Sequence, residues 1–396
     1  VKQVERSIYG LDVFQVVTVT PDEAIKSDGT LPLKVEARER KTQSIKVGVG
    51  LGIENNRWEQ HVTSIYTHRN LFGHLTRLDM RVVAGYAELP HPFRPVAHGP
   101  VVKVGPKLRK KGLLERRLVW TLEPGFELGI NEGYQFWSPT NRIGVSRFFF
   151  RFLELGVSHN LRYVNFFNLL EGFNSQASLL GLDFKDPYLL SYLQFVQKFY
   201  FTDQIVNPDN GAILGVTYDL AGLGGDYDYH KVTPSLRAYW RIIEHIQLAG
   251  RVEVGFIRPY GAKPGAPFDL KYYLGGTNSV RGWGFRRLSP KVDIADEKGV
   301  LRSVPVGGNT MFTASLEARF KVVGPLHLVG FYDIGDVREQ LSEFVPREWN
   351  HAVGPGLRLH TPIGVFRIDA GIRIGDTPLS LAESRWAFHF GLGEAF

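Results

Sequence analysis

The chain of 396 residues contains no cysteine, and its apolar runs are short. The absence of cysteine excludes a disulfide framework and thiol chemistry, and it removes the softest common metal ligand. No uncharged apolar run approaches the ~18 residues that a membrane-spanning helix needs. The first ten residues, VKQVERSIYG, are charged and lack the apolar stretch of a signal peptide. Hydropathy alone therefore indicates a soluble protein, but it overlooks transmembrane β-barrels, whose strands give weak signals.

Charge and short catalytic motifs add further exclusions. Lys and Arg number 47 against 40 Asp and Glu, and this excess of +7 is spread along the chain. Because no basic block of the kind found in nucleic-acid-binding tails is present, nucleic acid is not expected as a partner. Nucleotide-binding and nucleophile-elbow motifs are absent as well, and the histidines show no paired metal spacing. We therefore expect no enzyme activity, no catalytic residue, no metal and no cofactor.

What the sequence does contain is alternation with a period of two residues. In RLDMRVVA (77–84) and FRIDAGIRI (366–374), apolar side chains occupy one face, and arginines and aspartates occupy the other. Such segments recur from about residue 45 to the end, with no helix-period segment between them. In a soluble β-sandwich the apolar face is the interior, whereas in an outer-membrane barrel it contacts lipid. Alternation alone leaves both architectures open.

Two further features favour the barrel. Aromatic residues lie near many predicted strand ends, as an interfacial girdle requires, and the chain stops inside an apolar strand, RWAFHFGLGEAF. An exposed apolar edge strand is an aggregation hazard, and closing a barrel removes it. The sequence therefore predicts an all-β fold, a transmembrane antiparallel β-barrel over residues 43–396. Polar stretches such as 88–100 and 131–141 are predicted as loops.

The first 42 residues have a different character. Residues 1–14 are compatible with a short helix and a turn, and FQVVTVTPD and LPLKVEARERK are predicted as two strands around a polar loop. This α+β piece is too small to bury a core of its own. We interpret residues 1–42 as the last part of a domain that precedes the barrel, with a polar junction at 39–44.

Several stretches resemble motifs of the BamA/TamA superfamily of outer-membrane assembly factors, and they occur in the family's order. LGGTNSVRGW (274–283) resembles its loop motif, with Trp283 where Phe or Tyr is commoner, and SLEARF (315–320) and FYDIGDV (331–337) resemble the strand motifs that follow. RNLFGH (69–74) is similar to the second-hairpin motif of TamA-like members. FHFGLGEAF resembles the C-terminal β-signal, with signal residues Phe388, Phe390 and Phe396.

The resemblance carries further implications. It implies about sixteen strands in the outer membrane of a Gram-negative bacterium, and it identifies residues 1–42 as the C-terminal part of a periplasmic POTRA domain. The implied function is assembly and insertion of β-barrel or autotransporter clients. The implied partners are the outer-membrane bilayer, unfolded outer-membrane or secreted client proteins, and an inner-membrane-anchored, periplasm-spanning protein. Two alternatives stay open: a two-partner-type secretion pore, and a soluble β-sandwich binding protein.

The glycine-rich segment around 274–308 is expected to fold into the barrel lumen. An arginine carried into such a narrow space needs anionic partners, and Glu317 and Asp333 follow on later strands. A guanidinium can fork to carboxylates through charge-assisted hydrogen bonds. We therefore expect Arg281 to bind both carboxylates as a lock between loop and wall; the alternative is an exposed loop cation.

The neighbours of Arg281 are expected to support this lock. Gly282 lets the backbone approach the wall closely, and Trp283 wedges against it. For Arg286 and Arg287 two interpretations stay open, because one can assist the lock or both can face solvent.

The first and last barrel strands form the second candidate site. Glycines occupy one face of the first strand, and two more lie in the last strand: Gly48, Gly50, Gly52, Gly391 and Gly393. Glycine weakens strands, and closure of the barrel requires these two strands to pair. A weak lateral seam would allow opening and pairing with a client strand. Alternatively, the glycines only fit a crowded, curved wall.

Overall fold

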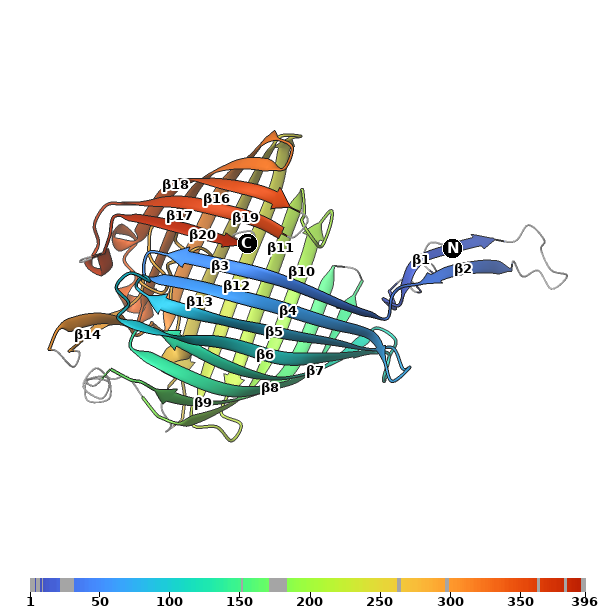
Figure 1. Cartoon of the computed structure of the whole chain (residues 1–396), viewed down its shortest axis with the longest axis horizontal. Helices are drawn as coiled ribbons and strands as arrows, with labels where there is room; N and C mark the ends of the chain where they lie inside the picture. The colour runs from blue at the N-terminus through green and yellow to red at the C-terminus, as the bar shows by residue number, and fades with distance from the viewer. Residues whose placement is uncertain are drawn as a thin grey trace.

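The computed structural model describes residues 4, 8, 10–21, 32–150, 152–170, 184–261, 265–295, 299–361, 364–380 and 383–392. Sixteen strands close into one antiparallel barrel, which confirms the predicted fold (Figure 1). Each strand pairs with its neighbour in the chain, and β13 pairs with β16 across the inward segment. The barrel strands are β3 (Gln43–Glu54), β4 (Arg57–Leu71), β5 (Thr76–Leu89), β6 (Ala97–Lys111), β7 (Leu118–Asn131), β8 (Tyr134–Phe149), β9 (Leu153–Phe167), β10 (Tyr188–Thr202), β11 (Gly211–Ala221), β12 (Tyr229–Ile243), β13 (Ile246–Pro259), β16 (Thr310–Val323), β17 (Leu326–Arg338), β18 (Asn350–Thr361), β19 (Gly364–Ile374) and β20 (Trp386–Leu392).

The two faces of the wall have opposite chemistry. Aliphatic side chains point outward, and Val49 and Leu316 are 80% and 53% exposed. Charged side chains on the alternate positions point inward, where Glu317 and Asp369 are fully buried. An apolar exterior around a charged interior is the arrangement of a membrane barrel and excludes the soluble sandwich. Among the described residues, no helix has the length and apolarity needed to cross a membrane.

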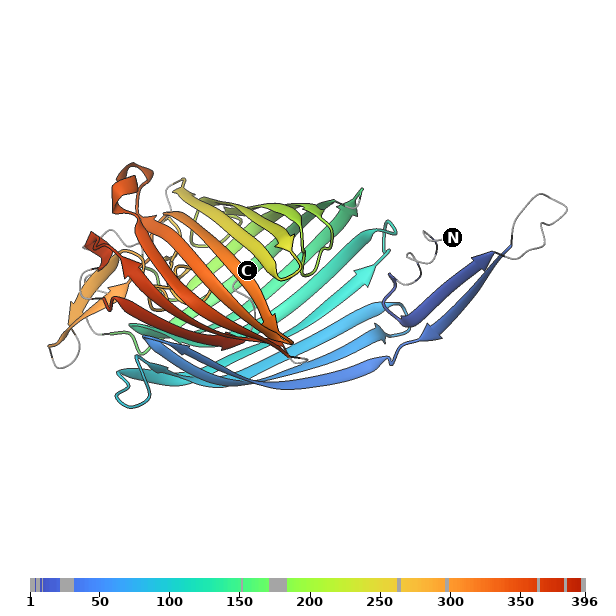
Figure 2. The same cartoon turned by 90° about the horizontal axis from the view of Figure 1, so that it is seen from above.

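The two rims of the barrel differ. We call the rim next to the N-terminal hairpin the proximal rim and the opposite one the distal rim (Figures 1 and 2). The N-terminal hairpin itself pairs β1 (Phe14–Pro21) with β2 (Leu33–Glu39), as the two predicted strands require. Most of the helix expected in residues 1–14 lies outside the described residues, although Val4 and Ile8 are helical.

Longer connections gather at the distal rim. The largest runs from the end of β13 to β16 and carries η1 (Phe268–Leu270) and a hairpin of β14 (Lys291–Ala295) with β15 (Leu301–Pro305) (Figure 2). The connection from β17 to β18 carries η2 (Leu341–Glu343) and η3 (Pro346–Glu348), and the one from β19 to β20 carries η4 (Pro378–Ser380). Unequal rims are typical of outer-membrane barrels.

Two predicted loops are shorter in the structure. The predicted loop 131–141 is wrong: β7 runs to Asn131, β8 begins at Tyr134, and only Glu132 and Gly133 turn the chain. Aromatic side chains on both faces of the start of β8 hide its alternation, since Tyr134 and Phe136 are buried inside the barrel while Trp137 lies on the other face. The predicted loop 88–100 shrinks to 90–96 because β5 and β6 extend into it.

The main apolar cluster lies inside the barrel. It joins side chains of the inward segment to side chains of the wall, so this part of the lumen is packed rather than open. Phe268, for example, packs against Tyr134 and Phe166 with ring centroids 5.0 and 5.3 Å apart. This packing holds the inward segment at the depth at which Arg281 reaches the wall. The cluster comprises, among others, Tyr134, Phe166, Tyr188, Ile257, Phe268, Val280, Trp283, Leu288, Ile294, Val304 and Val337.

Candidate functional site

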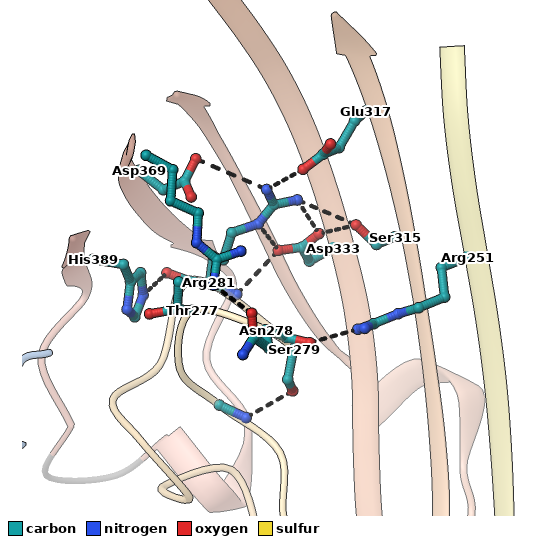
Figure 3. A network of polar contacts seen from close by, with 12 residues as sticks. Arg251, Thr277, Asn278, Ser279, Arg281, Ser315, Glu317, Asp333, Asp369 and His389 are labelled. Carbon is teal, nitrogen blue, oxygen red and sulfur yellow. Dashed lines mark hydrogen bonds and ion pairs between the residues drawn. The ribbon is translucent and has the colours of Figure 1, made fainter. Parts of the chain in front are cut away.

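Arg281 enters the lumen on the inward segment and meets both carboxylates expected from the sequence (Figure 3). Its Nε and Nη2 donate to the two oxygens of Asp333 at 2.7 and 2.8 Å, and its backbone N–H donates to the same carboxylate at 3.0 Å. Nη1 donates to Glu317 at 2.5 Å. All three side chains are at most 1% exposed. The geometry is that of a buried, bidentate guanidinium–carboxylate pair with a second carboxylate beside it.

A wider network surrounds this pair. Ser315 donates to Asp333 at 2.6 Å and accepts from Arg281, and the guanidinium lies 3.6 Å from the ring centroid of Phe331. Burial disfavours the charged guanidinium, but Asp333 and Glu317 outweigh this effect and raise the pKa of Arg281. The arginine is therefore charged at all physiological pH values.

Further charged side chains of the wall join this network. Asp369 on β19 lies 3.9 Å from Arg281 and accepts a 2.8 Å hydrogen bond from Arg358 on β18. Arg319 forms an ion pair with Glu317 at 2.9 Å. These arginines and carboxylates form one connected ion-pair network. Asp369 was noted in the sequence only as part of the polar face of its strand, and Arg358 was not singled out.

Close backbone contact holds the loop against the wall. A Cβ on Gly282 would lie 2.7 Å from the Cβ of Ala352, so this position leaves no room for a larger residue. On the wall, a Cβ on Gly371 would overlap the carbonyl group of Arg281. Glycines on both sides therefore permit the approach that aligns Arg281 with its carboxylates.

We expect Gly371→Ala to displace the loop from the wall, because the added methyl group competes with the Arg281 carbonyl for the same space. Overpacking of this kind costs about 1–3 kcal/mol of unfolding free energy. Denaturant unfolding in detergent measures this loss. Gly330→Ala is the matched control, since a Cβ on Gly330 of β17 meets no atom within 4 Å. Equal stability of the two variants would contradict the close contact.

Trp283 and the two following arginines are also held inside the barrel. Trp283 is 2% exposed, and the guanidinium carbon of Arg373 lies 4.7 Å from the centroid of the Trp283 ring. Arg286 stacks on Tyr273 at 3.5 Å, and Arg287 forms ion pairs at 2.7 Å with Glu132 and at 2.5 Å with Glu383. The interpretation that Arg286 and Arg287 both face solvent is therefore wrong, because each has a partner inside the lumen or at its mouth.

The seam between the first and last barrel strands is far less paired than the rest of the wall. Within the described part of the chain, β20 and β3 share one register pair, Phe390 with Ile53. The other edge of β3 pairs with β4 over its whole length, from Gln43–His68 to Glu54–Arg57. Most of the seam-side backbone edge of β3 thus has no partner strand among the described residues.

The seam glycines differ in their surroundings. A Cβ on Gly48 would meet nothing within 4 Å, and one on Gly52 would come no closer than 3.9 Å to another atom. Only Gly50 is crowded, by the ring of His61. A crowded wall therefore does not account for Gly48 and Gly52. Gly391 lies near Arg367, at 3.3 Å from a built Cβ, and Gly393 is outside the described residues.

The residues of the expected C-terminal signal are only partly described. Phe388 is 59% exposed on the outer face of β20, and Phe390 forms the seam pair with Ile53. Phe396 lies outside the described residues. His389, which was not singled out in the sequence, points inward between them and contacts the carbonyl oxygen of Arg281 at 2.7 Å (Figure 3).

The closed sixteen-stranded barrel, with its apolar exterior and its inward loop held by a buried arginine, has the architecture of a transmembrane β-barrel. Residues 138–396 match the model of the Omp85 superfamily domain, and the chain belongs to this superfamily. The chain is therefore an outer-membrane β-barrel protein of a Gram-negative bacterium, as the sequence predicted. The finer resemblance to TamA-like members stays a prediction.

Several curated proteins are similar in sequence to part of this chain. It is similar to the outer membrane protein assembly factor BamA of Nitratidesulfovibrio vulgaris, with 28% identity over 200 residues, 49% of this chain and 24% of that protein. BamA of Neisseria meningitidis is 31% identical over 141 residues, 34% of this chain and 17% of that protein. The human sorting and assembly machinery component 50 homolog is 33% identical over 85 residues, 21% of this chain and 18% of that protein. The chain thus spans less than a quarter of these relatives' lengths.

Solved structures share the fold. BamA from Haemophilus ducreyi lacking POTRA domains 1–3 superposes with a TM-score of 0.76 at 16% identity, over 99% of this chain and 77% of that chain. CdiB from Acinetobacter baumannii superposes with a TM-score of 0.63 at 12% identity, over 99% of this chain and 68% of that chain. At these identities the likeness concerns the fold alone.

Proposed function

We propose that this protein assists the assembly and insertion of outer-membrane β-barrel proteins at the seam between β3 and β20. The observation that carries the proposal is that, within residues 386–392 and 43–54, these strands share one register pair, Phe390 with Ile53, in a barrel whose other strands are paired along most of their length. An unpaired strand edge is a template for another chain. The names of the curated relatives, which are assembly factors, support the same activity.

The mechanism that this geometry supports is β-augmentation. A client strand pairs with the seam-side backbone edge of β3, and its main-chain hydrogen bonds supply the binding energy. Outward side chains of β3, such as Val47 and Val49, are 70% and 80% exposed and continue the apolar surface that the client must join. The step needs no catalytic residue, nucleotide or cofactor. The Arg281 lock keeps the inward segment and the β16–β19 wall rigid while the seam yields.

The position of the N-terminal hairpin supports one orientation of the barrel in the membrane. We assign residues 1–42 to the C-terminal end of a POTRA domain, so that the proximal rim faces the periplasm and the barrel occupies residues 43–396. Asp12 forms an ion pair with Arg40 at 3.1 Å and another with Arg77 on β5, which ties the hairpin to this rim. Unfolded clients then reach the seam from the periplasmic side, with the help of an inner-membrane-anchored partner.

Reconstitution tests the proposed function. Lipid vesicles that contain the full protein are expected to fold an added outer-membrane barrel faster than empty vesicles or vesicles with an unrelated barrel. The shift of the folded client on a gel without heating measures the folding rate. Folding rates equal to those of empty vesicles would contradict the proposal. Protease-protected entry of a soluble passenger, without client folding, would instead establish the secretion pore.

A further inference from the structure

The turn between β3 and β4 is unusual in what its side chains bind. Asn55 and Asn56 form the turn, and Glu54 and Arg57 close it as the last strand pair. In an ordinary hairpin turn, the asparagine side chain forms hydrogen bonds with the backbone of the turn itself. Here the side chains of Glu54, Asn55 and Asn56 bond to segments more than 70 positions away in the chain. The turn lies at the distal end of the seam, where β20 begins.

Asn55 takes the place of a strand partner for β20. Its side-chain nitrogen donates to the carbonyl oxygen of Trp386 at 2.6 Å, and its side-chain oxygen accepts from the backbone N–H of Phe388 at 2.9 Å. A neighbouring strand would offer the same donor and acceptor. One amide side chain therefore bonds to two backbone groups of β20 that precede Phe390, its one register partner of β3 among the described residues. The carbonyl oxygen of Trp386 also accepts from the side chain of Ser384 at 2.8 Å.

Asn56 makes the same kind of contact with the inward loop. Its side-chain oxygen accepts from the backbone N–H of Phe285 at 2.6 Å, and its nitrogen donates to the carbonyl oxygen of the same residue at 2.9 Å. The nitrogen also donates to Glu132 at 2.6 Å. Two adjacent asparagines thus hold the last strand on one side and the loop on the other.

Glu54 and His389 form a second connection between the inward loop and β20. Glu54 accepts from the backbone N–H of Thr277 in the loop at 2.9 Å and contacts His389 of β20 at 2.6 Å. The other ring nitrogen of His389 lies 2.7 Å from the carbonyl oxygen of Arg281. A continuous chain of hydrogen bonds therefore runs from Glu54 of the first hairpin through His389 of the last strand to the carbonyl group of Arg281. Figure 3 shows the last of these contacts, between His389 and Arg281.

We propose that the side chains of Glu54, Asn55 and Asn56 form a latch that closes the distal end of the seam and couples its opening to the position of the inward loop. The inference rests on the proposed role of the seam but not on the identity of any client. Because Asn55 makes two neutral, backbone-like hydrogen bonds, the peptide groups of an incoming strand can replace them one for one. A full backbone ladder along the seam would resist such an exchange.

Hydrogen exchange of the purified protein, in detergent and without client, tests the latch. Exchange of protected amides scales with the equilibrium constant of local opening. Loss of two neutral hydrogen bonds is expected to raise that constant about tenfold or more, so Asn55→Ala should speed exchange of residues 386–392 by this factor. Unchanged exchange of β20 in Asn55→Ala would overturn the latch.

The coupling has its own readout. Asn56 does not touch β20, yet Asn56→Ala is expected to speed exchange of residues 386–392 as well as of the loop around Phe285. Faster exchange confined to the loop would overturn the coupling. Asn70→Ala is the matched control, because Asn70 lies at the other end of β4 and its side chain bonds locally to Leu75. All variants must keep the folded band on unheated gels.

The latch and the proposed function fail in different ways. Faster exchange of β20 in Asn55→Ala, together with client folding by the wild-type protein no faster than in empty vesicles, would support the latch and contradict assembly at the seam. Unchanged exchange of β20, together with client folding faster than in empty vesicles, would overturn the latch and support the assembly function.

Discussion

Arg281→Ala is expected to lower the free energy of unfolding by about 3–5 kcal/mol, the usual loss when one partner of a buried ion pair is removed. The substitution leaves Glu317 and Asp333 in the lumen without the guanidinium that binds both, and each is fully buried. It also removes the cation that stacks on Phe331. Denaturant unfolding in detergent, followed by tryptophan fluorescence, measures the change.

Two further variants make this result specific. Arg281→Lys keeps the charge but cannot reproduce the fork that contacts both oxygens of Asp333, so an intermediate loss is expected. Arg94→Ala removes an exposed arginine from the 90–96 connection and should leave stability within about 0.5 kcal/mol of the wild type. If Arg281→Ala unfolds at the same denaturant concentration as Arg94→Ala, the lock does not stabilise the barrel.

The sequence predicted the barrel wall well because side-chain direction in a strand depends only on odd or even position. The alternation in residues 77–84 and 366–374 therefore separated the lipid face from the lumen face before any pairing was known. Glu317 and Asp333 lie on the inner face, and the resemblance of VRGW to a family motif supplied Arg281. Alternation failed at 131–141, where aromatics occupy both faces of the start of β8.

The sequence could not predict which residues of different strands meet inside the closed barrel. Asp369 and Arg358 lie on the inner face like many other charged residues, and only the stagger of the closed strands brings them to Arg281. Asn55 and Asn56 look like ordinary turn residues, since asparagine is common in hairpin turns. Their contacts with β20 and the loop depend on which strand closes the barrel beside them, and no local pattern encodes that neighbour.

A disulfide across the seam is expected to abolish client assembly. The chain has no cysteine, so an introduced pair is unique. Continuing the antiparallel register by one step from Phe390 and Ile53 places Gly391 opposite Gly52. Cα atoms of opposed residues lie about 4.5–5.5 Å apart, within the range that disulfides bridge. Both positions lie on the lumen face, and neither added Cβ would come closer than 3.3 Å to another atom.

The matched control closes a junction that has no role in the proposed opening. Ala318→Cys with Gly330→Cys links β16 to β17, where these two residues already form a register pair. Both pairs use small residues of the wall, and each disulfide joins neighbouring strands. Oxidation of the control pair should leave client folding unchanged, so any effect of oxidation on the vesicles or on the client appears in both proteins.

The most direct test of assembly at the seam is the rate of client folding in vesicles containing the Gly52→Cys, Gly391→Cys protein, measured oxidised and then after reduction. The account predicts a rate equal to that of empty vesicles when the disulfide is formed, and recovery to the wild-type rate when it is reduced. A wild-type rate with the seam fully crosslinked would contradict it.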